Sequence, residues 1–488
     1  MRAHRWAAWT ALRERAQVQA LARDLSLADR PSPARRPPIA RPGAARDGLR
    51  DRPEASPVSP SEIPPEIPLG LPTRRTGLNA LLAATAARHP ARPALIDRGD
   101  KPGWCGRPAM TWSYGAAAEI VARLARGIRR WRLPSGSRVG LWFAGGSEGL
   151  VAHLAVEAAG HVPCPMPAAW DEAQMLAAVE AAGIGAVLTQ GRLGERRPAE
   201  TLCRVALQVF SLRYLAAFGP DVPDGVINLD AMALERGGPD LPAGEGGGGL
   251  ISFAGRDPTR PVHRPGEALL AAVAAHLVAA RIGPGERLLT LLPPDDLRGL
   301  VTGLGAALVS GASLESLPVF DRAALDAILA EHPERPLHLV APAFLEGAIR
   351  DRIGAHDRPA LVLAHRAPAR LTGRRLTPGE GARTVDALAL DEDAVVSRAR
   401  GADDIALALA DPEAARFPAG LIELGRDGEG GLALRGQACR AAPLGERAGP
   451  PEAGAWRPAP WRATLFAGTA TALEPCPVTP ARLAPPGP

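Results

Sequence analysis

The sequence contains almost no lysine and few aromatic residues. Lys101 is the only lysine in 488 residues, so arginine carries nearly all of the positive charge, and aromatic residues make up only 4%. The formal net charge is +5, but the arginines are interleaved with acidic residues and do not gather in one patch. Surfaces that bind nucleic acids concentrate basic residues on one face, commonly with aromatic side chains that stack on bases. We therefore expect no nucleic-acid partner.

Long apolar runs and paired cysteines are also missing. The longest apolar run, 268–280, contains His276 and is too short to cross a bilayer. Arg13, Glu14 and Arg15 interrupt the first residues, where a secretory signal would need a continuous apolar segment. The five cysteines are widely spaced with no C-x-x-C pair, which argues against a disulfide framework or a zinc site. We expect a cytoplasmic protein with no membrane span.

Proline and glycine are abundant but unevenly distributed, and they divide the chain. A possible helix over 6–28 precedes a segment rich in Pro, Arg and Ser, without hydrophobic periodicity, that predicts a disordered linker. After it, strand and helix patterns alternate in two units separated by the glycine run 246–249, which predicts doubly wound parallel sheets. The fold class is therefore α/β. The expected parts are an N-terminal extension (1–75), a first α/β subdomain (76–245), a second α/β subdomain (246–400), a small β-rich subdomain (401–475) and a tail (476–488).

The individual elements follow from hydrophobic periodicity and from glycine and proline signals. In the first unit we expect helices over 78–87, 113–131, 149–159 and 172–182, and strands over 93–97, 138–143, 162–165 and 186–189. In the second unit we expect strands over 250–253, 287–292, 337–341 and 361–363, and helices over 267–280, 297–309 and 323–331. Short strands over 421–424 and 431–434 follow.

A series of short motifs occurs in the order typical of one known family. The matching segments are Met110–Tyr114, Ala125–Gly127, Gly136–Leu141, Leu154–Pro163, Pro284–Leu289 and Ala307–Ala312. On these segments the chain resembles the large domain of the adenylate-forming (AMP-dependent synthetase and ligase) superfamily, which includes the acyl-CoA synthetases, over about 76–475. The resemblance implies ATP or AMP and Mg²⁺ as cofactors, a carboxylate or acyl substrate, and CoA or a carrier protein as acceptor. It also implies a ligand cleft between the two α/β units.

The resemblance places a phosphate-binding loop in the segment Ser252–Arg264. The implied phosphate-binding residues there are Gly255, Arg256, Thr259 and Arg260, with Arg264 as a candidate catalytic cation. The loop departs from the family pattern, because Pro258 removes a backbone N–H group and Asp257 adds negative charge. Val262 stands where the family has a lysine, and arginine does not position charge as a lysine does. A structural turn that binds no nucleotide explains the segment equally well.

Other implied site residues are only partly present. Glu392 falls where the family has a glutamate near Mg²⁺, so it is the candidate metal ligand and catalytic carboxylate, with Asp391 beside it at the nucleotide; a solvated acidic turn is the alternative. Asp296 stands in place of a family histidine, and no aspartate lies near 461–464, where a ribose-binding one is expected. The family's C-terminal domain, with its catalytic lysine, is expected to be absent, since the sequence given ends at Pro488.

Three functions remain open. The first is a divergent acyl-CoA synthetase-like protein with weak or no adenylation activity, which binds an acyl compound or a nucleotide in a biosynthetic system or acts with a protein partner. The second is an active ligase whose arginines contact phosphate. The third is a serine hydrolase, because Gly145–Gly149 matches G-x-S-x-G around Ser147 between a strand and a helix. Asp326 with His338 or His365 would complete the triad order, but too few residues precede Ser147 for the usual hydrolase sheet.

Overall fold

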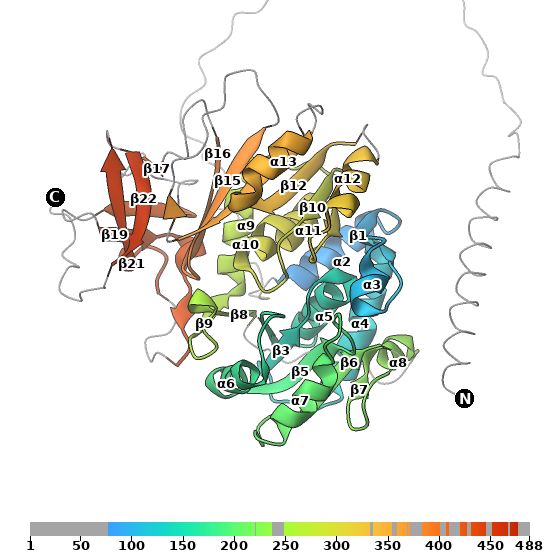
Figure 1. The fold of residues 1–488 in the computed structure, drawn as a ribbon. Helices are drawn as coiled ribbons and strands as arrows, with labels where there is room; N and C mark the ends of the chain where they lie inside the picture. The colour runs from blue at the N-terminus through green and yellow to red at the C-terminus, as the bar shows by residue number, and fades with distance from the viewer. Residues whose placement is uncertain are drawn as a thin grey trace, which may run out of the picture. The chain divides into compact units, whose positions relative to one another are not determined.

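The fold is taken from a computed structural model. It describes residues 77–219, 221–236, 248–331, 335–353, 359–367, 369–370, 383–400, 407–408, 420–426, 431–445, 451–466 and 469–476. Within these residues the strands form four sheets (Figure 1). The helix and linker predicted before residue 76 and most of the predicted tail lie outside the described residues.

A five-stranded parallel sheet with the order β4-β3-β5-β6-β7 forms the core of the first unit. From β3 the chain moves outward to β4 and then returns past β3 to β5, which places helices on both faces. The strands are β3 (Arg138–Trp142), β4 (Val162–Pro165), β5 (Ile184–Gln190), β6 (Tyr214–Phe218) and β7 (Ile227–Asn228). The helices are α4 (Tyr114–Arg129), α5 (Gly146–Ala158), α6 (Glu172–Ala182), α7 (Pro198–Ala206) and α8 (Leu229–Leu234), and α6 and α7 cover the outer face (Figure 1).

Local signals in the sequence fix the ends of these helices. Ser113 begins α4 by accepting a hydrogen bond from the backbone N–H of Ala116 at 3.2 Å. Asp171 and Gln174 form a reciprocal capping box at the start of α6, and Gly183 ends that helix in the left-handed conformation. Each cap satisfies backbone groups that the first or last turn leaves without a partner.

An eight-stranded sheet, mostly parallel, forms the second unit with the order β16-β15-β13-β12-β10-β11-β1-β2. Only the edge strands β2 and β16 pair antiparallel to their neighbours. The strands are β1 (Pro93–Asp97), β2 (Thr111–Ser113), β10 (Arg287–Thr290), β11 (Ser313–Ser316), β12 (Leu337–Pro342), β13 (Ala360–Arg366), β15 (Thr384–Leu390) and β16 (Ala394–Ala399). Strands β1 and β2 thus come from the segment that the sequence assigned to the first subdomain.

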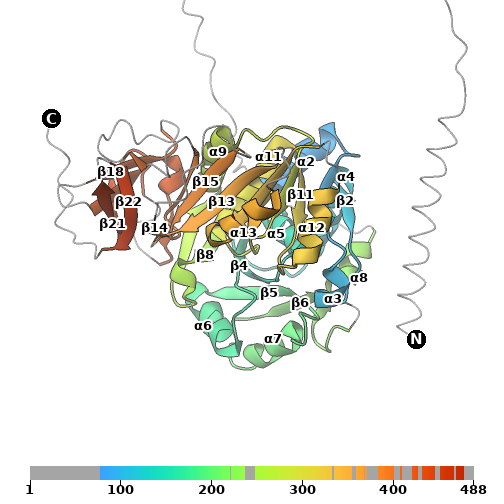
Figure 2. The same ribbon diagram turned by 45° about the horizontal axis from the view of Figure 1, so that its top comes forward.

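Helices cover both faces of this sheet, with α12 (Arg322–Ala330) and α13 (Glu346–Ile353) on one face and α9 (Gly266–Ala280) and α11 (Ala306–Ser310) on the other (Figure 2). The remaining helical segments of this part are α2 (Leu78–Arg88), α3 (Lys101–Cys105), α10 (Leu297–Gly299), the π-helix η2 (Leu300–Gly305) and the 3₁₀ turn η3 (Ala343–Leu345). The helix predicted over 297–309 is therefore continuous but includes a π-helical turn, a feature often found at functional sites.

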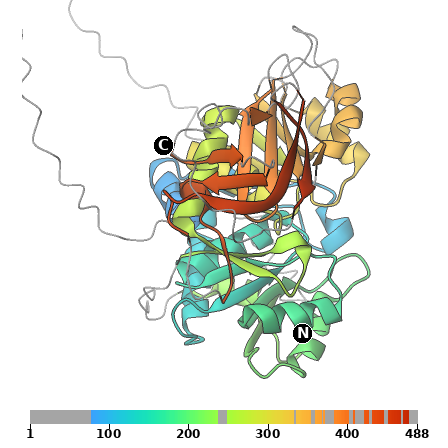
Figure 3. The ribbon, with the colours of Figure 1, turned by 90° about the vertical axis from the view of Figure 1, so that its left-hand side faces the viewer.

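Two smaller sheets complete the described structure. One contains β8 (Gly249–Phe253), β9 (Pro261–Pro265) and β20 (Ala442–Pro443). The other is antiparallel and contains β14 (Ala369–Arg370), β17 (Leu407–Ala408), β18 (Glu423–Arg426), β19 (Gly431–Arg435), β21 (Arg457–Phe466) and β22 (Thr469–Pro475). Figure 3 looks onto this second sheet, drawn in red, in front of the orange strands of the eight-stranded sheet.

The α/β fold class with a β-rich C-terminal part is confirmed. The domain boundaries near 245 and 400 stay predictions. Among the described residues no helix is both long and apolar enough to cross a membrane. The cytoplasmic location stays a prediction.

Candidate functional site

A pocket opens at the carboxyl ends of the central strands of the eight-stranded sheet. From β10 the chain steps to β11 on one side, and β12 then lies on the other side of β10, so the strand order reverses here. Ligands of open α/β sheets bind at such a reversal. The pocket has a volume of about 440 Å³ and is lined by Arg256, Leu292, Pro293, Asp296, Arg298, Pro342, Ala343, Phe344, Ala364, His365 and Arg366.

The segment predicted to bind phosphate forms a tight hairpin loop between β8 and β9. Gly255 and Arg256 adopt left-handed backbone conformations, with φ of 61° and 60°. The Asp257 side chain accepts hydrogen bonds from the backbone N–H (2.9 Å) and the hydroxyl (2.7 Å) of Thr259, and these bonds lower the pKa of Asp257. Asp257 thus acts as an internal acceptor at the position where a phosphate is expected.

Most backbone donors of this loop already have acceptors within the protein. The N–H groups concerned are those of Ala254, Gly255, Asp257, Thr259 and Arg260. That of Gly255 donates to Asp391 Oδ1 at 2.8 Å, and Pro258 has no N–H group. A phosphate-binding loop needs several free N–H groups that point at the anion. This loop does not offer them in the conformation observed.

Charged side chains of both signs surround the pocket and neutralise one another. Three guanidinium groups and four carboxyl groups meet here, from Arg256, Arg298 and Arg366 and from Asp295, Asp296, Asp391 and Glu392. Arg366 is the centre of this network, which we call the Arg366 network. Its Nη1 lies 3.2 Å from Glu392 Oε1 and 3.4 Å from Asp391 Oδ1, and its Nη2 lies 3.4 Å from Asp296 Oδ1. The four carboxyl groups of the network therefore outnumber its three guanidinium groups.

The remaining pairs of the network fix individual side chains. Asp296 caps α10 and binds Arg298 through two side-chain hydrogen bonds, at 2.9 and 2.5 Å. Burial raises the pKa of Asp296, but these bonds and the charges of Arg298 and Arg366 outweigh burial and leave it below the ordinary value. Asp295 pairs with Arg256, and burial holds the pKa of Asp295 above its ordinary value.

Glu392 is a buried carboxyl group of the site with a strongly raised pKa. Its side chain is buried, and burial raises its pKa to about 7 against the opposing charge of Arg366. The Ser252 hydroxyl lies close enough to lower that pKa, yet Glu392 Oε2 has no partner at hydrogen-bonding distance among the described residues. In the absence of a bound cation, a substantial share of Glu392 is therefore uncharged near neutral pH.

Arg264 lies beneath the loop, not in the pocket. It is fully buried, and its guanidinium donates to the backbone oxygens of Ala438 (2.8 Å) and Glu392 (2.6 Å). It ties β9 to the turn after β15 and to the segment before β20. Thr259 and Arg260 are exposed at the tip of the loop. The structure thus places Arg256 in the pocket lining and brings Gly255, Asp391 and Glu392 next to one another beside it, while Arg264 is buried outside the pocket.

These residues do not fit a magnesium-bound triphosphate. Most backbone N–H groups of the loop already have acceptors, and the guanidinium groups of Arg256, Arg298 and Arg366 that line the pocket are paired with carboxyl groups. In the described part of the chain, no three histidine, cysteine, aspartate or glutamate side chains gather in a way that would hold a metal ion.

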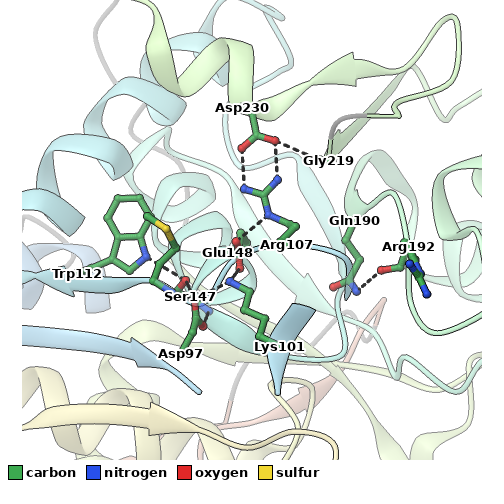
Figure 4. Close-up of polar contacts among 11 residues, drawn as sticks. Asp97, Lys101, Arg107, Trp112, Ser147, Glu148, Gln190, Arg192, Gly219 and Asp230 are labelled. Atoms are coloured by element: carbon green, nitrogen blue, oxygen red, sulfur yellow. Dashed lines mark hydrogen bonds and ion pairs between the residues drawn. The ribbon is translucent and has the colours of Figure 1, made fainter. Parts of the chain in front are cut away.

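Ser147 takes part in a buried polar network at the start of α5 (Figure 4). Its hydroxyl donates to Asp97 at 2.7 Å and accepts from Trp112 Nε1 at 3.0 Å. The Lys101 amine lies 2.5 Å from both Asp97 Oδ2 and Glu148 Oε2. The predicted triad partners pair elsewhere, with Asp326 on Arg352, His338 on Glu286 and His365 on Asp386. The structure does not assemble a catalytic triad around Ser147.

The sequence did not single out Arg298, Arg366 or Phe344 as pocket residues. Arg366 was predictable in part, because it ends a parallel strand, and side chains at carboxyl ends of such strands meet at the ligand edge.

Comparisons with known proteins agree with the fold. Residues 82–223 match the family model described as AMP-binding enzyme. A benzoate CoA ligase from Burkholderia xenovorans LB400 has a similar structure, with 17% identity, a TM-score of 0.62 and coverage of 82% of this chain and 80% of that chain. The N-terminal domain of FACL13 from Mycobacterium tuberculosis has 15% identity, a TM-score of 0.56 and coverage of 82% and 99%.

A third similar structure is the N-terminal subdomain of Klebsiella oxytoca NpsA in complex with anthranilyl-AMSN, with 16% identity, a TM-score of 0.54 and coverage of 82% and 100%. No curated protein sequence matches the chain. The resemblance to the adenylate-forming superfamily is therefore confirmed in the fold and in the matched segment.

Proposed function

We propose that this chain, which has the fold of the large domain of the adenylate-forming enzymes, binds a small carboxylic acid or acyl compound and has weak or no adenylation activity. The binding site is the pocket at the carboxyl ends of β10, β12 and β13. Its volume of about 440 Å³ suits a small organic ligand. Its lining is partly apolar, with Leu292, Pro293 and Phe344, and partly cationic.

One observation supports the proposal that adenylation activity is weak or absent. Most backbone donors of the hairpin loop and all guanidinium groups of the Arg366 network already have partners, so no cluster of free cations for three phosphates remains at the pocket among the described residues. A ligand with a single carboxylate needs hydrogen bonds from only one guanidinium group, so the ion pairs of the Arg366 network can stay in place. CoA or a carrier protein as acceptor, and a protein partner, stay predictions.

Two assays on the purified chain test the proposal together. Carboxylate-dependent ATP–pyrophosphate exchange should stay at background, whereas small carboxylic acids should raise the melting temperature. Ala343→Trp places a large side chain in the pocket and should abolish this stabilisation. Ala348→Trp, at an exposed position of α13 outside the pocket, is the matched control and should retain it.

Robust exchange would overturn the proposal and favour an active divergent ligase. One residue gives that alternative a specific basis. The Arg260 guanidinium is exposed and has no hydrogen-bonding partner among the described residues, so it is a cation still available to phosphate. Exchange that disappears in Arg260→Gln and in Glu392→Ala would assign the activity to this site.

A further inference from the structure

A histidine held by a buried carboxylate faces the same pocket. His365 lies near the end of β13 and lines the pocket, and its Nε2 lies 3.0 Å from Asp386 Oδ1 on the neighbouring strand β15. Arg400 also donates two hydrogen bonds to that carboxylate, from Nε to Oδ2 at 2.7 Å and from Nη2 to Oδ1 at 2.5 Å. The same Arg400 donates to Glu346 at 2.7 Å. The imidazole orientation is therefore fixed by groups outside the pocket.

These contacts determine which ring nitrogen carries the proton. Burial raises the pKa of Asp386, but the hydrogen bonds from Arg400 and His365 outweigh it and hold the pKa below its ordinary value. An ionised Asp386 can only accept, so Nε2 of His365 must donate. In the neutral ring Nδ1 then keeps a lone pair and is a hydrogen-bond acceptor.

Nδ1 of His365 is available to a ligand. It has no hydrogen-bonding partner among the described residues, and it is not a buried atom. Four other histidines differ in this respect, because each buries its unpartnered nitrogen: His153, His161, His276 and His338. His365 thus offers the pocket an oriented acceptor, beside walls whose other polar groups are mainly guanidinium donors.

An exposed aromatic ring lies at the same pocket. Phe344 is 85% exposed in the 3₁₀ turn after β12, next to Pro342 and Ala343. An aromatic side chain with this exposure is a surface on which a planar ligand can pack, and pairs of aromatic rings attract one another beyond the burial of their area.

We propose that the pocket selects an aromatic carboxylic acid that carries a hydroxyl or N–H group, with the aromatic ring against Phe344 and the donor group on Nδ1 of His365. This inference rests on the proposed function and specifies its ligand. His365 is a specificity-determining residue that Asp386 positions. A neutral hydrogen bond of this kind should make the matching ligand roughly two- to tenfold tighter than its counterpart without the donor.

Calorimetric titration with benzoate and its 2-, 3- and 4-hydroxy derivatives tests the inference. For the wild type we expect at least one hydroxybenzoate to bind roughly two- to tenfold more tightly than benzoate. His365→Asn keeps an acceptor close to the position of Nδ1 and should retain the preference. His365→Gln can still donate to Asp386 but has no acceptor at that position, so the preference should disappear. Phe344→Ala should weaken all four ligands alike.

The pair of His365 variants separates ligand contact from a structural role. If His365 only supported Asp386, glutamine would be the harmless replacement and asparagine the damaging one. A hydroxyl preference that survives in His365→Gln, or equal binding of all four acids by the wild type, would overturn the inference while leaving the proposed function intact. Absence of binding by any acid, with folding shown by a cooperative melt, would instead refute the proposed function.

Discussion

Glu392→Gln is expected to stabilise the protein at alkaline pH. The Glu392 side chain is only 4% exposed, and burial raises its pKa to about 7, from an ordinary value of 4.5. A carboxyl group with a raised folded-state pKa gives its full stability below the unfolded pKa and loses it as pH rises through the folded one. At 1.36 kcal/mol for each pKa unit, the wild type should lose roughly 2–3 kcal/mol between pH 5 and pH 8 through this group.

Glutamine removes this penalty with little change in volume. Its amide oxygen can keep the contact with Arg366, and its NH₂ group can take the place of Oε2, which has no partner among the described residues. Urea unfolding of both proteins at pH 5, 6, 7 and 8 measures the difference. The two should be close at pH 5, and the variant should be more stable at pH 8. A variant that is less stable by the same amount at every pH would refute the reasoning.

The same titration tests the metal prediction. A carboxylate must be ionised to bind Mg²⁺. If Glu392 were a magnesium ligand, the metal would therefore stabilise the folded wild-type protein most strongly at pH 8. On the electrostatics of the Arg366 network, we expect excess MgCl₂ to leave the wild-type and Glu392→Gln unfolding curves unchanged at that pH. Stabilisation of the wild type alone would restore Glu392 as a metal ligand.

Two further predictions concern the network at the start of α5. Lys101→Met leaves Asp97 and Glu148 buried without the shared amine and should cost about 3–5 kcal/mol in urea unfolding at pH 7. Because burial and the charge of Glu148 raise the pKa of Asp97, Asp97 becomes protonated as the pH falls, and the cost of the substitution should then shrink. A cost below about 1 kcal/mol at pH 7 would contradict the ion pairing. Ser147→Ala removes the hydrogen bonds to Asp97 and Trp112 and should cost about 1–3 kcal/mol. Neither the wild type nor this variant should react with a fluorophosphonate probe, and labelling that depends on Ser147 would revive the hydrolase.

The sequence predicted well those elements that local signals delimit. The strands Pro93–Asp97 and Val162–Pro165 and the helix Glu172–Ala182 occur with the predicted bounds, because glycine, proline and capping residues flank them. Strand Thr384–Leu390 was not predicted as a strand. It is buried on both faces, and its residues after Asp386 are all apolar, so the alternation of polar and apolar residues that marks a half-buried strand does not continue along it. Strand Pro261–Pro265 was not predicted, because proline at both ends of the segment is typical of a loop.

The candidate site was predictable only where one segment carries the information. Asp391 and Glu392 were predicted because the resemblance covers their segment, and the structure places both in contact with Arg366, which lines the pocket. Their partner Arg366 lies on a different strand, and the parallel pairing of β13 with β15 sets it opposite Ala389. That pairing is a long-range property of the sheet, and neither propensity nor spacing along the chain indicates it.

The Arg366 network also explains why a phosphate would compete poorly for this pocket. To bind phosphate, Arg366 would have to turn away from Asp296, Asp391 and Glu392, which it currently contacts within 3.4 Å. Asp296 would keep Arg298, but Asp391 and the buried Glu392 would lose the Arg366 guanidinium, and breaking a buried pair costs about 3–5 kcal/mol. A ligand that leaves these ion pairs in place avoids that cost. The same arginine that stabilises the empty pocket therefore favours a ligand with at most one negative charge.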